Sequence, residues 1–318
     1  MIEQTEEVGF AGLRLRDADG DVTATFVPKA GMVGISLQDA GVELLGQRRG
    51  LAAYVDEGRT MGIPLLHPWA NRLARDSYSA AGVAVDLPIS APGLHRDGNG
   101  LAIHGLLPGA RDWQVEHADD LAAATSFTAT FDFAAHPELL ASFPFPHALR
   151  LEIALANRTL TVTTTLTATG ETAVPVAYGF HPYLTLPGTP RAQWQLELPP
   201  MTHLQLDDRG IPTGTSLTEP SRRLGLGSRT FDDAYTEVEQ GAELSLLDDH
   251  RRIDVTFEQG FPATQVFAPA GEDVVCFEPM TAPTNALVSG KGLRLVAPGE
   301  EDVTRFSIAL ADTQQWST

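Results

Sequence analysis

The sequence predicts an all-β protein, a large antiparallel β-sandwich of many strands with few short helices. Three observations support this prediction. Apolar and polar residues alternate with a period of two in many short runs, which is typical of half-buried strands. The 29 glycines and 22 prolines are spread through the 318 residues and punctuate those runs. A helical period of 3.6 residues is sparse.

Along the chain, residues 136–143 could form a short helix. Residues 149–155 then alternate leucine and isoleucine with other residues, and residues 160–168 do the same with a threonine face. Because a turn-like Ala156-Asn157-Arg158 separates these two runs, they predict a hairpin on a half-buried sheet. Further strands are predicted by the shorter alternating runs at 194–198, 204–206, 253–257, 293–295 and 306–310. No linker or fixed repeat interrupts the pattern, so we expect one domain over residues 1–318.

Composition indicates an ordinary globular protein whose charge disfavours nucleic acid and anionic lipid as partners. Hydrophobic residues make up 43% and charged residues 20%, and no apolar run approaches the roughly 18 residues that span a bilayer. The 41 acids against 22 bases give a net charge of −19, which repels nucleic acid and anionic lipid. The acidic first seven residues lack the order of a signal peptide, and Cys276 is the lone cysteine. We therefore expect a cytoplasmic protein without nucleic-acid or membrane partners.

Two segments carry the residues best suited to acid–base chemistry. In residues 177–184, Ala-Tyr-Gly-Phe-His-Pro-Tyr-Leu, Pro182 and the flanking aromatics restrict His181 at the end of an alternating strand. Glu278 ends an apolar run, where partial desolvation would raise the pKa of its carboxyl group. Histidine as proton donor and glutamate as acceptor suffice to move a proton across a small substrate. Structural tyrosines at a strand end and an outward-facing carboxylate on an edge strand are the alternatives.

Three weaker motifs could bind a ligand. Asn71 and Arg72 end a run with two prolines, and arginine offers a planar fork of donors for hydroxyl or carboxylate oxygens. His104 precedes a glycine, which lets another group approach the ring closely, although a histidine after an apolar triplet is more typical of a core. Asp232 and Asp233 lie between two aromatics, but adjacent acids are also typical of solvated turns.

Several other chemistries lack their sequence motifs. Neither HExxH nor CxxC occurs, so a dedicated metal site is not expected. The phosphate-binding loops GxGxxG and GxxxxGK[ST] and the hydrolase motif GxSxG are also missing. Cys276, beside an apolar run, is expected to be inert packing rather than a nucleophile.

Taken together in their order along the chain, the five motifs resemble the aldose 1-epimerase (galactose mutarotase-like) family. The resemblance covers nearly the whole chain and rests on Asn71-Arg72, His104-Gly105, His181-Pro182-Tyr183, the Asp232 to Tyr235 segment and Glu278-Pro279. It implies a large galactose mutarotase-like β-sandwich with an open sugar cleft on one sheet. It also implies an isomerase that interconverts the α and β anomers of a free hexose or related aldose, as a monomer or homodimer, without a metal or redox cofactor.

The resemblance assigns roles by position. His181 matches the general acid that protonates the ring oxygen, and Glu278 matches the base that takes the proton from the anomeric hydroxyl. We expect the two to face one cleft from opposite sides of a pyranose-sized gap. The residues expected to contact the sugar are Asn71, Arg72, His104, Tyr183, Asp232 and, as the neighbouring alternative to Asp232, Asp233.

Two departures leave the sugar open. Leu184 stands where the galactose enzymes have phenylalanine, and Gly-Leu-Leu follows His104 rather than a second glycine, as in the broad bacterial branches. Glucose, galactose, a pentose or a sugar phosphate remain candidates. A hexose-6-phosphate 1-epimerase would use Arg72 and Arg75 for the phosphate. A non-catalytic sugar-binding or sensing protein is another alternative, and a glycoside-processing enzyme would need two carboxylates at the bond.

Overall fold

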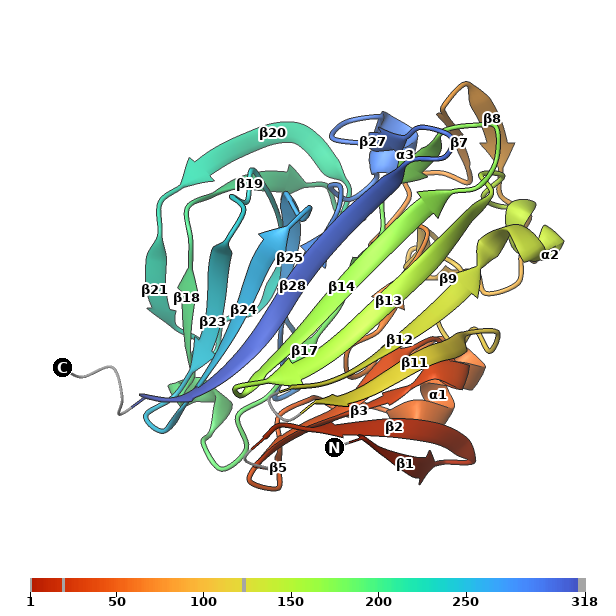
Figure 1. The fold of residues 1–318 in the computed structure, drawn as a ribbon. Coiled ribbons are helices and arrows are strands. Elements are labelled where there is room, and N and C mark those ends of the chain that lie inside the picture. The colour runs from red at the N-terminus through yellow and green to blue at the C-terminus, as the bar shows by residue number, and fades with distance from the viewer. Residues whose placement is uncertain (1, 19–20, 122–123, 314–318) are drawn as a thin grey trace.

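The computed structural model describes residues 2–18, 21–121 and 124–313, and two large antiparallel sheets form its framework (Figure 1). In these residues the nine-stranded sheet runs, in spatial order, β11 (Gln114–Leu121), β12 (Ala124–Asp132), β13 (His147–Ala156), β14 (Thr159–Ala168), β28 (Glu301–Asp312), β24 (Arg251–Gln259), β23 (Ala242–Leu247), β18 (Gln195–Leu198) and β21 (Arg222–Gly225). The eight-stranded sheet runs β20 (Pro212–Glu219), β19 (Met201–Leu206), β22 (Phe231–Thr236), β25 (Ala263–Ala268), β26 (Val275–Met280), β16 (Gly179–Phe180) and β6 (Leu65–Leu66), and β17 (Tyr183–Leu184) also pairs with β26.

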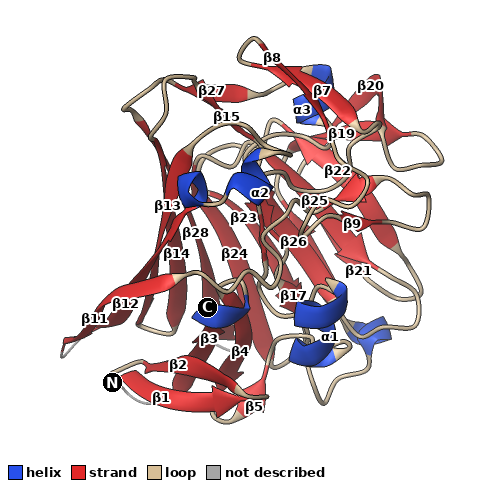
Figure 2. Ribbon diagram, turned by 90° about the vertical axis from the view of Figure 1, so that its right-hand side faces the viewer, coloured by secondary structure: helices blue, strands red, loops and turns tan. Residues whose placement is uncertain are grey.

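Smaller elements close the ends of this sandwich (Figures 1 and 2). A five-stranded sheet comprises β1 (Ile2–Glu7), β2 (Phe10–Arg16), β3 (Val22–Val27), β4 (Val33–Asp39) and β5 (Val42–Glu43). Three two-stranded sheets pair β7 (Ser77–Ala80) with β8 (Val83–Asp86), β9 (His95–Arg96) with β10 (Ala102–Ile103), and β15 (Val174–Val176) with β27 (Arg294–Val296). The α-helices are α1 (Gly50–Glu57), α2 (Pro137–Leu140) and α3 (Ala286–Ser289), and short 3-10 turns cover Pro28–Ala30, Phe133–Ala135 and Arg191–Gln193.

The hairpin predicted from alternation is confirmed. Strands β13 and β14 pair from end to end, with Leu155 opposite Leu160, and both leucines are buried. The connecting residues Asn157 and Arg158 have φ of 49° and 59°, the left-handed conformation of a two-residue hairpin turn. The other alternating runs fall on β18, β19, β24, β27 and β28. Alternation therefore located these strands because one face of each sheet packs on the core.

The helices were predicted less well. The helix expected over residues 136–143 is limited to α2, four residues long, and ends before the prolines at 144 and 146. Helix α1 was not predicted, because it buries only Leu51 and Tyr54 and leaves too few apolar positions to set a helical period. Among the described residues, no helix is both long and apolar enough to cross a bilayer.

Strand β26 separates the core from the candidate site. All six of its residues are buried. Val275 and Phe277 belong to the main hydrophobic cluster between the sheets. Cys276, Glu278 and Met280 alternate with them and point to the other face, where Met280 packs in a small cluster with Leu66, and Cys276 in one with Tyr183. A carboxylate is therefore buried on the side of the sheet that faces away from the core.

A buried histidine pair supports the segment that leads from β6 towards Asn71. The Nε2 atoms of His67 and His147 are 2.8 Å apart. His147 Nδ1 lies 2.7 Å from the Phe145 carbonyl and must donate to it, so its Nε2 accepts from His67 Nε2. Burial lowers the pKa of both rings, to about 4 for His147. Both rings are therefore neutral near pH 7.

Acidification is expected to destabilise the fold through this pair. In the unfolded chain a histidine takes up a proton below about pH 6.5, whereas folded His147 resists protonation until about pH 4. The stability it contributes is therefore present above pH 6.5 and is lost as the pH falls towards 4. His147 alone should lower the free energy of unfolding by about 2 kcal/mol between pH 7 and pH 5. Urea unfolding at the two pH values measures this loss.

A variant pair isolates the effect. In His147→Gln, the amide oxygen can still accept the hydrogen bond from His67 but does not titrate, so the loss on acidification should shrink by about the amount expected for His147. The exposed His250→Gln serves as the control and should keep the full loss. The same pH dependence in His147→Gln as in the unaltered protein would contradict the assignment.

Candidate active site

Sheet register places His181 opposite Glu278. On one edge of β26, Gly179 of β16 pairs with Met280, and Tyr183 of β17 pairs with Cys276. Both pairs belong to the same antiparallel register, and in that register His181 lies opposite Glu278. The strand was expected to end at Glu278 but continues through Pro279, which lacks an N–H for the ladder and lies where the pairing is interrupted.

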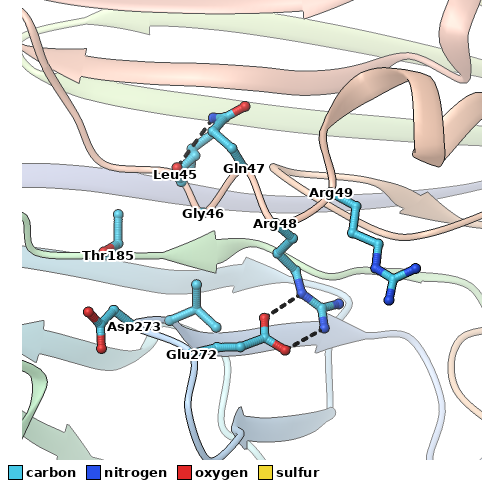
Figure 3. A pocket seen from close by; sticks show the side chains of 9 residues that line it. Leu45, Gly46, Gln47, Arg48, Arg49, Thr185, Glu272 and Asp273 are labelled. Atoms are coloured by element: carbon cyan, nitrogen blue, oxygen red, sulfur yellow. Dashed lines mark hydrogen bonds and ion pairs between the residues drawn. The ribbon is translucent and has the colours of Figure 1, made fainter.

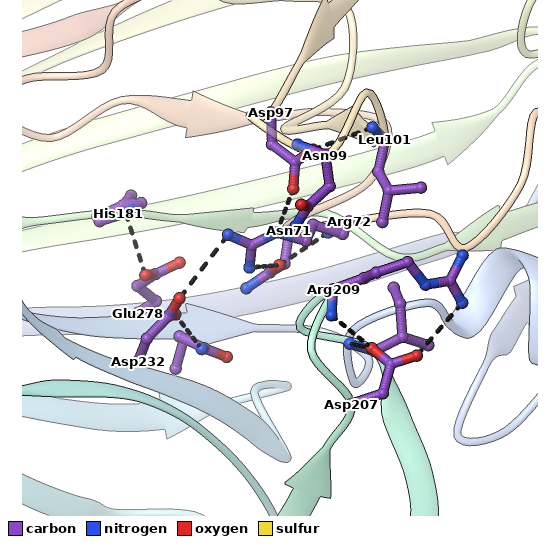
Figure 4. Close-up of polar contacts among 12 residues, drawn as sticks. Asn71, Arg72, Asp97, Asn99, Leu101, His181, Asp207, Arg209, Asp232 and Glu278 are labelled. Atoms are coloured by element: carbon purple, nitrogen blue, oxygen red, sulfur yellow. Dashed lines mark hydrogen bonds and ion pairs between the residues drawn. The ribbon is translucent and has the colours of Figure 1, made fainter.

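The two side chains touch. His181 Nε2 lies 3.1 Å from Glu278 Oε1 (Figure 4), and the residues are 4% and 1% exposed. The expectation of a pyranose-sized gap between them is therefore wrong. Cross-strand neighbours have Cβ atoms only about 4.5–5.5 Å apart, which is too close for a sugar ring. A substrate would have to lie across one side of the pair, within reach of both groups.

Burial sets the proton content of this pair. It raises the pKa of Glu278 well above its usual range, and the nearby Asp232 carboxylate raises it further. Burial also lowers the pKa of His181 well below its usual range. Both shifts follow from the cost of a charge out of water. Burial therefore disfavours both charged forms, and a proton held by the pair is favoured on Glu278 over His181.

Arg72 is held at the edge of this pair by several oxygens (Figure 4). Its Nε donates to Asp97 at 2.7 Å, Nη1 donates to the Asn71 side-chain oxygen at 3.3 Å, and Nη2 lies 3.7 Å from Asp232. The turn between β19 and β20 packs on the guanidinium, where a Cβ on Gly210 would come within 2.9 Å of Nη1. Two carboxylates and a close-packed turn therefore fix the direction of the guanidinium fork.

The site face of the sheet distinguishes Asp232 from Asp233. Asp232 is the register partner of Phe267 and accepts a hydrogen bond from Gln265 at 2.6 Å. Gln265 in turn is the register partner of Glu278. Asp233 points to the opposite face, where its carboxylate lies 3.9 Å from His203 Nε2. Only Asp232 therefore shares a face with the acid–base pair.

His104 completes the group from a strained loop. It has φ of 63°, and its N–H donates to the carbonyl of Asn71, which has φ of 56°. Positive φ at residues other than glycine is costly and is frequent at functional sites. The imidazole packs edge-on against His181, with ring centroids 5.5 Å apart. Burial, aided by the charge of Arg72, lowers the pKa of His104 to about 3, so the ring is neutral.

The glycine after His104 has a different role from the one expected. A Cβ at Gly105 would overlap the His67 carbonyl, and φ there is 74°. The close approach is therefore made by the main chain of residue 67 and not by a group that reaches the ring of His104.

A cleft of about 380 Å³ opens beside the site, and its walls include Thr60, Asp97 and His104. This volume lies within the range of about 300–1,000 Å³ usual for small-molecule pockets. Four buried side-chain atoms nearby have no hydrogen-bond partner within the described structure: Nδ1 of His104, Nδ1 of His181, Oε1 of Gln265 and Oε2 of Glu278. Buried polar atoms normally find partners, so these atoms are available to a polar ligand.

Two of the expected sugar contacts, Tyr183 and Asn71, are engaged by neighbouring site residues in this structure. Tyr183 is 1% exposed, and its ring is stacked on His181, with centroids 4.3 Å apart. Asn71 is 3% exposed, and its side-chain oxygen accepts from the backbone N–H of Arg72 at 2.8 Å as well as from the guanidinium. Both side chains support a neighbouring site residue, and the resemblance alone did not reveal this.

Sequence reasoning also missed residues that the fold brings in. Asp97 and Gln265 hold Arg72 and Asp232, respectively. Gln265 could have been noticed as a lone amide in the apolar strand β25, whereas Asp97 lay in a polar loop without any signal. Within residues 2–18, 21–121 and 124–313, no three histidine, cysteine or acidic side chains are grouped to hold a metal ion. Cys276 is fully buried, which raises the pKa of its thiol well above its usual range.

These features define a β-sandwich protein with a buried acid–base pair at the edge of a polar cleft. The family model for aldose 1-epimerase matches residues 19–309, and the chain belongs to this family. A related protein, the uncharacterized protein YihR of Escherichia coli K12, is 26% identical over 264 residues, which cover 77% of this chain and 80% of that protein.

Solved structures confirm the fold class. A galactose mutarotase-like protein from Clostridium acetobutylicum superposes with a TM-score of 0.83 at 17% identity, covering 98% of this chain and 99% of that one. Galactose 1-epimerase from Lactobacillus acidophilus NCFM superposes with a TM-score of 0.78 at 14% identity, covering 98% of each chain. At these identities the likeness shows the galactose mutarotase-like sandwich and no more.

Proposed function

We propose that this protein is an aldose 1-epimerase, which interconverts the α and β anomers of a free hexose or related aldose. The observation that carries the proposal is the buried contact between His181 and Glu278. We infer that this pair holds one proton in the active enzyme. Membership of the aldose 1-epimerase family supports it.

In the proposed reaction the shared proton first passes from Glu278 to His181 across their 3.1 Å contact. The Glu278 carboxylate then takes the proton from the anomeric hydroxyl, and protonated His181 gives its proton to the ring oxygen. The C1–O5 bond breaks, and C1 becomes the aldehyde carbon of the open chain. The proton that left the imidazole is balanced by the one that arrived on the carboxyl group, so the pair again holds one proton. Rotation about the C1–C2 bond presents the other carbonyl face, and the reverse transfers close the ring as the other anomer.

The neighbouring side chains suit a neutral, hydroxyl-rich substrate. Arg72 offers donors to sugar oxygens, and Asp232, whose side chain is 48% exposed, offers acceptors to sugar hydroxyls. His104 is uncharged and can accept or donate. The two phosphate candidates do not form a pair of free cations, because Arg72 faces Asp97 and Asp232 while Arg75 bonds the Ser77 carbonyl. We therefore favour a free aldose over a sugar phosphate.

The lone buried thiol and the charge of −19 fit an enzyme of the cytoplasm, and we propose that location. Polarimetry over glucose, galactose, xylose, arabinose and glucose 6-phosphate tests the function. Accelerated decay of the optical rotation of at least one free aldose is expected. A protein that binds these sugars without accelerating the decay would instead be a sugar-binding protein, and release of reducing ends from a glycoside would indicate a hydrolase.

Adjacent aspartates provide a matched test of the sugar contact. Asp232→Asn should lower kcat/KM by about tenfold, because one charge-assisted hydrogen bond to the sugar and the ion pair with Arg72 are weakened. Asp233→Asn, on the opposite face, should remain within about twofold of the unaltered protein, as a substitution away from the site usually does. Equal losses in both variants, measured by polarimetry, would contradict the placement.

A further inference from the structure

The plane of the His181 ring is fixed by Tyr183. The two rings are parallel within 7°, with centroids 4.3 Å apart. Phe267 and His104 pack edge-on against His181 at 5.7 Å and 5.5 Å. Because an imidazole N–H lies in the plane of its ring, the orientation of the stacked tyrosine decides where His181 Nε2 points.

Hydrogen bonds of the Tyr183 hydroxyl in turn fix the tyrosine. Its oxygen lies 2.7 Å from Thr60 Oγ1, 3.1 Å from Arg48 Nη1 and 3.2 Å from His181 Nε2. Arg48 can only donate, so it occupies one lone pair of the hydroxyl oxygen. Because the tyrosine ring is stacked on the imidazole, its hydroxyl lies outside the imidazole plane and is poorly placed to bond His181 Nε2. The Tyr183 hydroxyl therefore donates to Thr60 Oγ1, and the N–H of His181 remains available to Glu278.

Arg48 is itself locked in place (Figure 3). Its Nε and Nη2 make a two-pronged contact with Glu272 at 2.8 Å and 2.9 Å, and its guanidinium lies 4.9 Å from the centre of the Tyr183 ring. The backbone of Arg48 has φ of 44°, a strained value for a residue with a side chain. The Arg48–Glu272 pair also lines both the cleft beside His104 and a second cavity of about 480 Å³. A strained backbone and a two-pronged contact therefore hold one donor against the tyrosine.

We propose that Arg48 is a positioning residue for the acid–base pair: braced by Glu272, it holds Tyr183 and thereby aims the His181 imidazole at Glu278. The inference rests on the proposed function for its effect on the rate, but the alignment itself is a property of the protein without substrate. Thr60 shares the task by accepting a hydrogen bond from the Tyr183 hydroxyl.

The charge of Arg48 adds a second effect. Burial lowers the pKa of His181 most, and the neighbouring His104 and Arg48 lower it further. Removing the positive charge should let the His181–Glu278 pair keep its proton to higher pH. The pH at which His181 titrates and the pH values of both sides of the bell-shaped rate profile should then increase together.

The test uses Arg48→Met, Arg48→Lys and Glu272→Gln. In Arg48→Met, kcat should fall about 10- to 100-fold because the catalytic group is misaligned, while KM stays within about threefold. The ¹⁵N imidazole titration of His181 should move to higher pH. Arg48→Lys keeps a positive charge at residue 48 but loses the planar guanidinium, and Glu272→Gln keeps Arg48 charged but weakens its two-pronged contact. In both variants kcat should therefore fall, while the titration of His181 stays close to that of the unaltered protein.

Arg150→Met is the control. Arg150 lies on β13 in the nine-stranded sheet, away from both cavities, and pairs with Glu152 at 3.3 Å, so kcat and the titration should not change. Unchanged kcat and titration in Arg48→Met would overturn the proposal. If the unaltered protein is inactive on every sugar but the titration still moves in Arg48→Met, the proposed function fails and the positioning role stands. Thermal unfolding confirms that each variant is folded.

Discussion

Glu278→Gln is expected to slow mutarotation by about 10²- to 10⁴-fold, the usual contribution of a general base. The amide has the shape of the carboxyl group but cannot take a proton from the anomeric hydroxyl. Because Glu278 is 1% exposed and burial favours its uncharged form, the neutral amide should leave the midpoint of thermal unfolding unchanged or slightly raised. Polarimetry with the best sugar measures the rate, and calorimetry measures the midpoint.

The control for this variant is Glu300→Gln, which changes an exposed carboxylate in the turn before β28. It should retain the full rate. Full activity in Glu278→Gln, with the fold intact, would contradict the assignment of Glu278 as the base.

His181→Asn should be as severe, with a loss of about 10²- to 10⁴-fold. Asparagine keeps a hydrogen-bonding group near Glu278 Oε1 but cannot carry the proton to the ring oxygen. The stacked Tyr183 also loses its partner, so a modest fall in stability is expected besides. The rate is followed by polarimetry, with the unfolding midpoint measured in parallel.

The double variant separates a coupled pair from two independent groups. If His181 and Glu278 share one proton, removing the second group costs little once the first is gone, because residues that act as a unit are not additive. The double variant should therefore be about as slow as either single variant. Losses that multiply would show that the two groups act independently.

The strands were predictable because buried and exposed side chains alternate from one residue to the next, and the sequence shows this alternation directly. Leucine, isoleucine and threonine alternate along β13 and β14, and the pattern alone gives the faces and the turn. Helix α1 was not predictable in this way, because it is short and covers little of the core.

The site was predictable only in part. His181 and Glu278 were found from their local settings and from the order of the motifs, but their contact depends on the shared register of β16 and β17 on β26, which no local pattern encodes. For the same reason the expected gap between them was wrong. Asp97 and Arg48 act through partners distant in the chain, at Arg72 and Glu272, and so lacked any sequence signal.

If the buried His181–Glu278 pair holds one proton and interconverts the anomers of an aldose, the protein should speed exchange between the α and β anomeric protons. This rate is followed by NMR at equilibrium across pH with the best sugar of the panel. We expect enzyme-dependent exchange with a bell-shaped pH dependence, falling when the pair gains a second proton or loses its only one. Exchange no faster than in buffer at every pH, or an unchanged profile in Glu278→Gln, would contradict it.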